Sequence, residues 1–236
     1  MHGLASALDE ARALAAALDE RPPGARVALC PPATLIHRMS AVLAGSRVAV
    51  GGQDCRAEPA GAFTGCIAAE MLADAGASLV VLGHSERRGA YGETSAEIAA
   101  KAGAAVRAGL EPIVCLGETL ADREAGRAFE VVLAQLGQSL PEVLAGHAFA
   151  LAYEPVWAIG SGRTPTPPQI EAMHGAIAAA LARRWGEAAE RTPILYGGSV
   201  KAANAAEILA LRYVGGALVG GASLTAADFL PIVRAA

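Results

Sequence analysis

The residues best suited to chemistry stand where an apolar run ends, at Ala152-Tyr153-Glu154-Pro155. A carboxylate that leaves a buried strand is partly desolvated, which disfavours its charged form and makes it a better base. The segment after Glu154 is apolar at its centre, is stiffened by Pro155 and ends in glycines, as expected of a loop that closes over a ligand. We therefore predict a general base followed directly by a lid. The alternative is a strand-end carboxylate that faces water. The predicted lid comprises Pro155, Val156, Trp157, Ala158, Ile159, Gly160 and Ser161.

A histidine follows another apolar run, in Leu82-Gly83-His84-Ser85-Glu86. At the start of a helix, the positive end of the helix dipole is expected to lower the pKa of the His84 imidazole. A neutral imidazole can donate a hydrogen bond to a substrate carbonyl and polarise it. The same residues also fit a structural, capping histidine beside an ordinary ion-pair network that includes Glu86.

Two glycine pairs end the last apolar runs of the chain, in Tyr196-Gly197-Gly198-Ser199 and Val219-Gly220-Gly221. Without a Cβ, backbone N–H groups can come close to an anion. Tight turns would explain one pair, but two pairs at successive strand ends, beside Ser199, indicate a phosphate site. A base, a carbonyl-polarising histidine, a phosphate anchor and a lid together predict proton transfer next to the carbonyl of a small phosphorylated substrate.

The elements that position these residues follow a repeating strand and helix pattern, which predicts a parallel sheet in a single (β/α) barrel domain over residues 1–236. The polar and glycine residues follow the strands, at the edge of a barrel that carries the active site. The predicted strands lie at Arg26–Cys30, Arg47–Val50, Leu79–Leu82, Pro112–Leu116, Ala148–Tyr153, Pro193–Tyr196 and Ala217–Val219. The clearest predicted helices are Leu4–Asp19, Ala96–Arg107 and Ile170–Arg184.

The composition narrows the class of protein further. A chain of 236 residues with 53% hydrophobic content has the size of one α/β barrel. No apolar run approaches the ~18–20 residues of a membrane span, so we expect no membrane partner. A net charge of -4 without a basic cluster argues against nucleic acid. The 4 cysteines form no CxxC pair, so we expect neither disulfides nor a metal site. No signal peptide pattern opens the sequence, which predicts a cytoplasmic protein.

Three motifs make the whole chain resemble the triosephosphate isomerase family: Gly83-His84-Ser85-Glu86-Arg87-Arg88, the segment from Tyr153 to Gly160, and the two glycine loops. The resemblance implies an α/β fold, the (β/α)8 TIM barrel, and interconversion of dihydroxyacetone phosphate and glyceraldehyde 3-phosphate in glycolysis and gluconeogenesis, without a cofactor. It implies Glu154 as base and His84 as electrophile, roles for which this enzyme is the reference example. By the same resemblance Glu86 supports the site. The implied phosphate ligands are Gly160, Ser199, Gly220 and Gly221.

The resemblance also implies an oligomeric state. The segment Gly61-Ala62-Phe63-Thr64-Gly65 is similar to the interdigitating loop through which members of the family form dimers. A homodimer that associates through the loop around Phe63 and Thr64 is therefore expected.

One part of the family pattern has no counterpart in the sequence. The family begins with a strand ending in an Asn-x-Lys motif, whose Lys contacts the substrate phosphate and whose Asn helps to bind substrate. Here Met1-His2-Gly3 resembles the family's residues just after that Lys. We therefore expect seven strands with two unpaired edges, and weak or absent activity for the chain as written. Three explanations stay open: a start at an internal Met, an inactive homologue that only binds phosphorylated ligands or a partner, and completion of the barrel by another chain.

Overall fold

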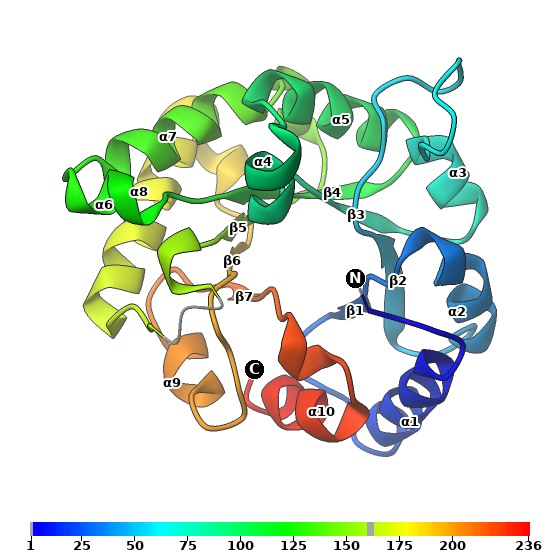
Figure 1. The fold of residues 1–236 in the computed structure, drawn as a ribbon. Coiled ribbons are helices and arrows are strands. Elements are labelled where there is room, and N and C mark those ends of the chain that lie inside the picture. Colours follow the sequence, from blue (N-terminus) through cyan, green and yellow to red (C-terminus); the bar gives the residue numbers. More distant parts are fainter. Residues whose placement is uncertain (1, 160–162) are drawn as a thin grey trace.

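The computed structural model describes residues 2–159 and 163–236, and within them a curved sheet of seven parallel strands is surrounded by helices. Each strand pairs with the next one along the chain. Figure 1 looks along the axis of this open barrel and shows the helices outside the strands. The strands are β1 (Val27–Leu29), β2 (Val48–Gly52), β3 (Leu79–Leu82), β4 (Glu111–Leu116), β5 (Ala150–Tyr153), β6 (Ile194–Tyr196) and β7 (Gly216–Ala217).

Helices follow the strands and cover the outer face of the sheet. The α-helices are α1 (Ala7–Glu20), α2 (Ile36–Val42), α3 (Ala69–Asp74), α4 (Ser85–Tyr91), α5 (Ser95–Arg107), α6 (Leu120–Glu124), α7 (Ala128–Ser139), α8 (Pro167–Trp185), α9 (Ala205–Leu209) and α10 (Ala226–Arg234). Short 3-10 turns are η1 (Ala33–Leu35), η2 (Glu142–Gly146), η3 (Val156–Ala158), η4 (Gly186–Ala189) and η5 (Gly221–Ser223). None of the helices in the described part of the chain is long and apolar enough to cross a membrane.

The apolar runs form strands because both faces of the sheet are covered. Every residue of β3 and of β5 is buried, as expected for parallel strands between a packed interior and a layer of helices. In the register of the sheet, Leu116 of β4 lies beside Tyr153 of β5, which in turn lies beside Tyr196 of β6. These three strands therefore end together, and the residues that follow them converge at one edge of the barrel.

Helices close the ring where the strands do not. Within the described residues, β1 and β7 are the two ends of the sheet and are not paired with each other. On the outside, α1 and α10 lie side by side (Figure 1). The Ala226 backbone N–H donates to Glu10 Oε2 at 2.8 Å, and Arg234 Nη2 donates to the Ala17 carbonyl at 3.0 Å. The two ends of the chain are thus joined through helix contacts rather than through a strand ladder.

The predicted strands are confirmed: Leu79–Leu82 has the predicted ends, and the ends of the others differ by at most two residues. The last strand shares only Ala217 with its prediction, because it runs over Gly216–Ala217 and not over Ala217–Val219. The Leu218 N–H still donates to the Tyr196 carbonyl at 2.9 Å, but the Val219 carbonyl accepts a hydrogen bond from the Ser223 hydroxyl at 3.0 Å. This local bond turns the chain into η5, and the second glycine loop therefore begins earlier than predicted.

Candidate active site

His84 stands at the start of α4, where a glycine turns the chain out of β3. Gly83 has φ +67°, and a Cβ there would lie 2.5 Å from Ile98 Cδ1, so a larger residue does not fit. The His84 ring caps the helix, because its Nδ1 accepts a hydrogen bond from the Glu86 N–H at 3.3 Å. This bond leaves the ring proton on Nε2, which lies 2.9 Å from Glu154 Oε1.

Glu154 follows β5 and is almost fully enclosed, with its side chain 2% exposed. Its backbone N–H donates to the Leu116 carbonyl at 2.7 Å, which ties it to the end of β4. Besides His84, its carboxylate accepts hydrogen bonds from the Ser85 N–H at 2.8 Å and the Ser85 hydroxyl at 3.2 Å. The predicted base and the predicted electrophile therefore face each other, and Ser85, which sequence reasoning missed, holds the base.

Two glycines make room for this carboxylate. A Cβ on Gly117 would lie 1.9 Å from the Glu154 carbonyl oxygen, and a Cβ on Gly197 would lie 2.8 Å from Glu154 Cγ. Any side chain at either position would displace the base. Gly197 belongs to the Gly197-Gly198 pair, which was predicted to bind phosphate. In the structure Gly197 instead makes room for the Glu154 side chain.

The expected lowering of the His84 pKa is wrong. Burial acts to lower this pKa, but the hydrogen bond and the negative charge of Glu154 outweigh burial, with a further contribution from Glu86, and hold the pKa above its ordinary value. The dipole of a helix of only 7 residues does not overcome a carboxylate at 2.9 Å. The neutral form is still the one whose Nδ1 can accept from the Glu86 N–H.

The described part of the predicted lid is anchored at its first turn. Pro155 leads into η3, Ile159 is exposed, and Gly160 and Ser161 lie outside the described residues. Trp157 Nε1 donates to Glu118 Oε1 at 2.8 Å. Glu118 follows β4 and is fully buried.

The same Glu118 oxygen also accepts hydrogen bonds from the Tyr153 hydroxyl at 3.1 Å and from Arg123 Nη1 at 3.2 Å. Glu118 was not predicted as a site residue. The available signal was its place just after a buried strand, one residue further on than Glu154 stands after its own strand.

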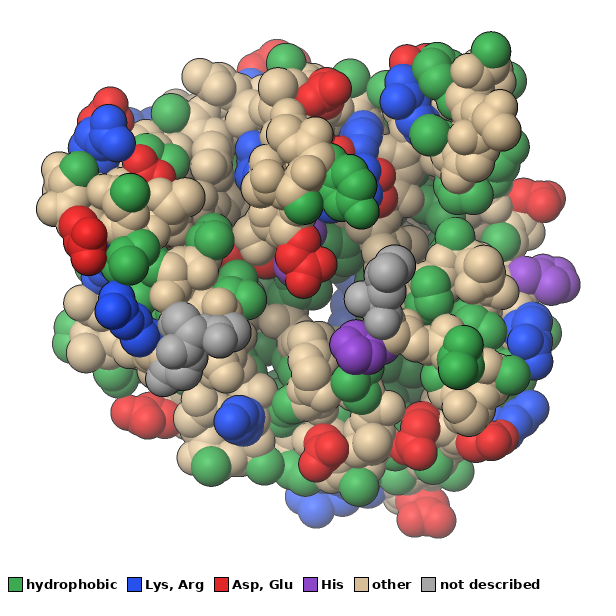
Figure 2. All heavy atoms as spheres, in the orientation of Figure 1, with side chains coloured by type: hydrophobic (Ala, Val, Ile, Leu, Met, Phe, Trp, Pro, Cys, Tyr) green, Lys and Arg blue, Asp and Glu red, His purple; other side chains and the backbone are tan. Residues whose placement is uncertain are grey.

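The two glycine loops start side by side at the same edge of the barrel as His84 and Glu154. Ser199 and Gly220 are exposed, and Gly221 is the first residue of η5. The Asn204 side chain donates to the Ser199 carbonyl at 3.2 Å, which shapes the first loop. Figure 2 shows this face, which is hollowed at its centre. The phosphate-binding role of these residues stays a prediction.

Glu86 contacts the site mainly through its backbone. Its side chain is 81% exposed, and Oε2 lies 4.0 Å from His84 Nδ1. The bond that orients the imidazole comes from the Glu86 N–H. A supporting role for Glu86 is therefore served by its main chain in this arrangement.

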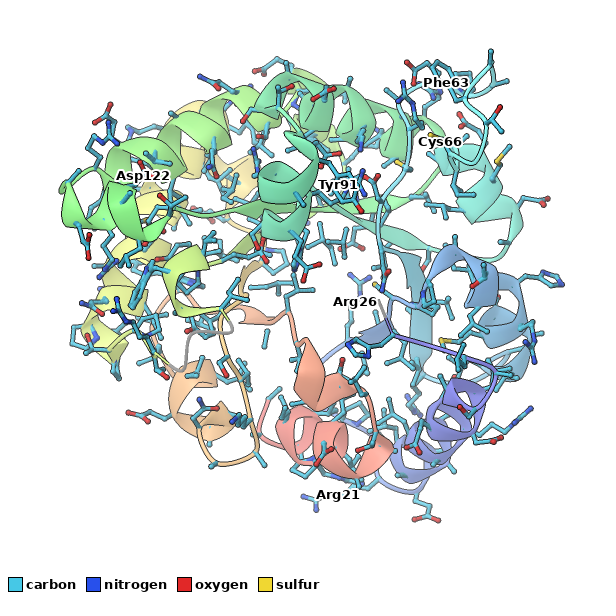
Figure 3. All side chains as sticks on the ribbon, viewed as in Figure 1. Arg21, Arg26, Phe63, Cys66, Tyr91 and Asp122 are labelled. Carbon is cyan, nitrogen blue, oxygen red and sulfur yellow. The ribbon has the colours of Figure 1, made fainter. Side chains whose placement is uncertain are left out.

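The predicted dimer loop stands out from the ring of helices, as the labelled Phe63 and Cys66 show in Figure 3. The Phe63 ring lies under the Arg56 guanidinium, 4.1 Å from its carbon, while Thr64 is exposed. No group of acidic, His and Cys side chains within residues 2–159 and 163–236 has the arrangement of a metal site.

Comparison with known proteins identifies relatives across the full chain. The model of the triosephosphate isomerase family matches residues 1–236. The chain is 60% identical to the triosephosphate isomerase of Caulobacter vibrioides over 235 residues, covering 100% of this chain and 93% of the relative. It is 56% identical to that of Ruegeria pomeroyi over 236 residues, with 100% and 93% covered.

A solved structure agrees with these relatives. The crystal structure of triosephosphate isomerase from Bartonella henselae is 41% identical, with a TM-score of 0.91 over 100% of this chain and 94% of that chain. Matches of this length and identity give no support to the expected loss of activity or to the alternative of an inactive homologue that only binds ligands.

Proposed function

This chain belongs to the triosephosphate isomerase family of intramolecular oxidoreductases, and we propose that it interconverts dihydroxyacetone phosphate and D-glyceraldehyde 3-phosphate through Glu154. The observation that carries the proposal is the 2.9 Å contact between His84 Nε2 and Glu154 Oε1. It brings together a buried carboxylate, which can act as a base, and an imidazole N–H, which can polarise a carbonyl, at the edge of the barrel where the strands end.

The proposed reaction moves one proton between neighbouring carbons. The Glu154 carboxylate takes a proton from the carbon beside the carbonyl, and the electrons of the broken C–H bond form the C=C bond of an enediolate. The carbonyl oxygen gains the negative charge, which the His84 Nε2–H stabilises. Glu154 then returns the proton to the adjacent carbon, while the hydroxyl proton shifts between the two neighbouring oxygens, so that the former carbonyl oxygen becomes a hydroxyl and the former hydroxyl oxygen becomes the new carbonyl. No electron leaves the substrate, so the reaction needs no redox cofactor.

The resting hydrogen bonds of Glu154 must open during this cycle. Its carboxylate accepts hydrogen bonds from Ser85 and His84. We propose that the substrate carbonyl takes the place of Glu154 at the His84 Nε2–H, and that the lid from Pro155 to Ser161 closes and excludes water. We propose Gly160, Ser199, Gly220 and Gly221 as ligands of the phosphate.

We propose that the protein is a homodimer, formed by the loop around Phe63 and Thr64, whose projection from the body supports a role in contact. We place its activity in glycolysis and gluconeogenesis and propose a cytoplasmic location, in line with the family.

The test is coupled turnover on both triose phosphates, with Glu154→Asp as the informative variant. Shortening the side chain withdraws the carboxylate by about 1.5 Å and should lower kcat by about 100-fold or more. Glu130→Asp, on the exposed surface of α7, makes the same chemical change away from the site and should leave kcat unchanged.

A second measurement separates the function from the role of Glu154. The transition-state mimic phosphoglycolate should bind the parent protein much more tightly than inorganic phosphate does. A parent protein without turnover and without this preference would contradict the proposed function. Unchanged turnover in Glu154→Asp would contradict only the role of Glu154 as base.

A further inference from the structure

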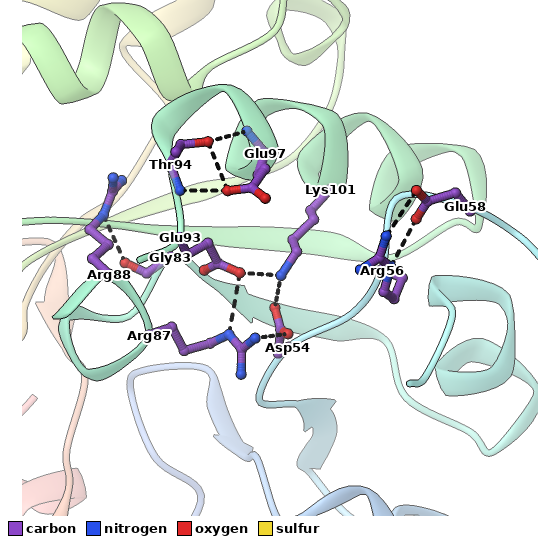
Figure 4. A network of polar contacts seen from close by, with 10 residues as sticks. All are labelled: Asp54, Arg56, Glu58, Gly83, Arg87, Arg88, Glu93, Thr94, Glu97 and Lys101. Carbon is purple, nitrogen blue, oxygen red and sulfur yellow. Dashed lines mark hydrogen bonds and ion pairs between the residues drawn. The ribbon is translucent and has the colours of Figure 1, made fainter. Parts of the chain in front are cut away.

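Arg88, which the proposed reaction does not use, has an unusually complete set of partners. Its Nε donates to the Gly83 carbonyl at 3.0 Å, and its Nη2 donates to the Cys115 carbonyl at 3.0 Å. Nη1 and Nη2 also donate to the hydroxyls of Ser95 and Ser139, each at 3.1 Å. Figure 4 shows the guanidinium turned back from α4 onto Gly83. These four bonds use most of the N–H groups that a guanidinium has.

The two carbonyls lie at the ends of two neighbouring strands, just after β3 and one residue before the end of β4, and both are close in the chain to contacts of the site. Gly83 directly precedes His84. Cys115 directly precedes Leu116, whose carbonyl accepts the backbone N–H of Glu154 at 2.7 Å. Arg88 therefore joins the turn that carries the electrophile to β4, the strand to which the backbone of the base is hydrogen-bonded.

We propose that Arg88 is a positioning residue, which sets the separation of His84 and Glu154 by fixing the end of β3 against the end of β4. The inference rests on the proposed function and adds to it a residue that touches neither substrate nor base. A displacement of about 1 Å between reacting groups can cost about 100-fold in rate, so a clamp on this spacing has a measurable effect.

An arginine suits this task better than another residue of similar length. Its planar fork presents N–H groups in fixed directions, so one side chain can bind two carbonyls and two hydroxyls at once. The Ser139 side chain is fully buried, and together with Ser95 it fixes the plane of the guanidinium. The neighbouring Arg87 points elsewhere and pairs with Asp54 and Glu93, so it does not share this role.

The experiment compares Arg88→Met with Arg184→Met. Arg184 is a matched control, because it also donates to two backbone carbonyls, those of Gly137 at 3.2 Å and Leu140 at 2.8 Å, but at the end of α8. Both variants should lose thermal stability. Only Arg88→Met should lower kcat, by about 10- to 100-fold, with KM changed less than about threefold because its four hydrogen-bond partners all lie outside the two glycine loops.

Three further results make the test decisive. Arg88→Lys keeps a cation with three donors but loses the fork, and should recover part of the lost kcat. If Arg88→Met does not fold, Arg88→Lys alone should show a lower kcat at unchanged KM. A folded Arg88 variant with full kcat, or an equal loss of kcat in Arg184→Met, would overturn the inference.

A measurement that needs no turnover keeps the inference separate from the proposed function. In a nuclear magnetic resonance titration of the His84 ring, Arg88→Lys, which keeps the positive charge, should move the pKa towards the ordinary value of histidine, because the Glu154 contact lengthens. Arg184→Lys should leave it unchanged. An inactive parent protein would contradict the proposed function alone, whereas a His84 titration unmoved by Arg88→Lys would overturn the positioning role.

Discussion

Glu154 and Glu93 are both withdrawn from water, yet their surroundings differ in charge. The side chains are 2% and 5% exposed. Glu154 accepts hydrogen bonds from an imidazole N–H and from the amide and hydroxyl of Ser85. Glu93 instead accepts from two permanent cations, Arg87 Nε at 3.3 Å and the ammonium of Lys101.

The cations around Glu93 belong to a closed cluster of four charges (Figure 4). Arg87 and Lys101 each bind Asp54 as well, both at 2.8 Å. Burial raises the pKa of Asp54 above its ordinary range, although the bonds from Lys101 and the charge of Arg87 oppose the rise. Two carboxylates and two cations thus compensate one another.

This difference shows how one residue type serves two purposes. Permanent cations stabilise the charged form of a carboxylate and make a change of protonation costly. Neutral donors hold a carboxylate in place at a smaller cost to protonation, and a general base must be protonated once in each cycle. The surroundings of Glu154 therefore suit a general base. Those of Glu93 suit a permanent ion-pair cluster that holds the loop after β2 against α5.

The largest expected effect comes from Glu154→Gln, which removes the base and nearly preserves its shape. We expect kcat to fall by about 1,000-fold, since general base catalysis contributes about 100- to 10,000-fold, while the free energy of unfolding changes little. Coupled turnover and urea unfolding measure the two quantities. A variant that retains one tenth of the parent activity would show that Glu154 is not the general base.

The matched change, Glu93→Gln, should act on stability instead. It leaves the cations of the cluster with one carboxylate, and breaking a buried ion pair costs about 3 kcal/mol. Urea unfolding should show this loss, while turnover per folded molecule stays within about twofold of the parent, because the ion pairs of Glu93 are with Arg87 and Lys101 and not with His84 or Glu154. If turnover falls and the free energy of unfolding does not, Glu93 serves catalysis rather than stability, and the assignment is wrong.

His174 is a third buried ionisable group, and its hydrogen-bond partner among the described residues is a neutral carbonyl. Its Nδ1 donates to the Tyr213 carbonyl at 3.2 Å, and its Nε2 has no hydrogen-bond partner within the described residues. Burial outweighs this bond and lowers the pKa of His174 to about 4. The unfolded chain binds a proton near pH 6.5 and the folded protein only near pH 4, so stability falls as the pH drops through that window.

Between pH 7 and pH 5 the loss from this one group should be about 2 kcal/mol. Urea unfolding at a series of pH values measures it. His174→Asn keeps a donor for the Tyr213 carbonyl but does not titrate, so its stability should depend less on pH by the same amount. Equal pH dependence in the parent and the variant would show that the imidazole is solvated or charged in the folded protein.

The smallest expected effect concerns Glu118, which accepts hydrogen bonds from a cation, Arg123, and from the neutral groups of Tyr153 and Trp157. Trp157→Phe removes one neutral donor from this buried carboxylate and should cost about 1 kcal/mol or slightly more. Trp185→Phe is the control, because its Nε1 donates at 3.1 Å to Glu142, whose side chain is 76% exposed and regains water. Thermal unfolding measures the Tm of both variants. An equal fall in Tm would show that burial of the carboxylate does not decide how much stability is lost with the donor.

The fold and part of the site could be predicted from the sequence. Short apolar runs alternating with helical stretches predict a parallel sheet, and the types of residue that end the runs predict which edge carries chemistry. For this reason Glu154 and His84 were singled out, and the structure places them 2.9 Å apart, while seven strands were predicted at the observed places. The early end of β7 was missed, because it depends on a bond from the Ser223 hydroxyl four residues further on.

The residues that were missed act through contacts across long stretches of chain. Arg88 meets Cys115 and Ser139 over 27 and 51 positions, and Glu118 meets Trp157 over 39. Spacing within a motif carries no information about such pairs. The direction of the His84 pKa shift was mispredicted for the same reason, because Glu154, the charge that dominates it, comes from a different strand.

The sequence by itself determined the order of the strands and the residues that leave them, because burial on both faces requires continuous apolar runs and each run must end in a turn. Only the tertiary structure decided which of those residues meet, which carboxylate has cations and which has neutral donors, and that α1 and α10 rather than β1 and β7 join the two ends of the chain. These outcomes depend on distances of about 3 Å between residues far apart in the chain, and such distances arise only when the sheet and the helices have packed.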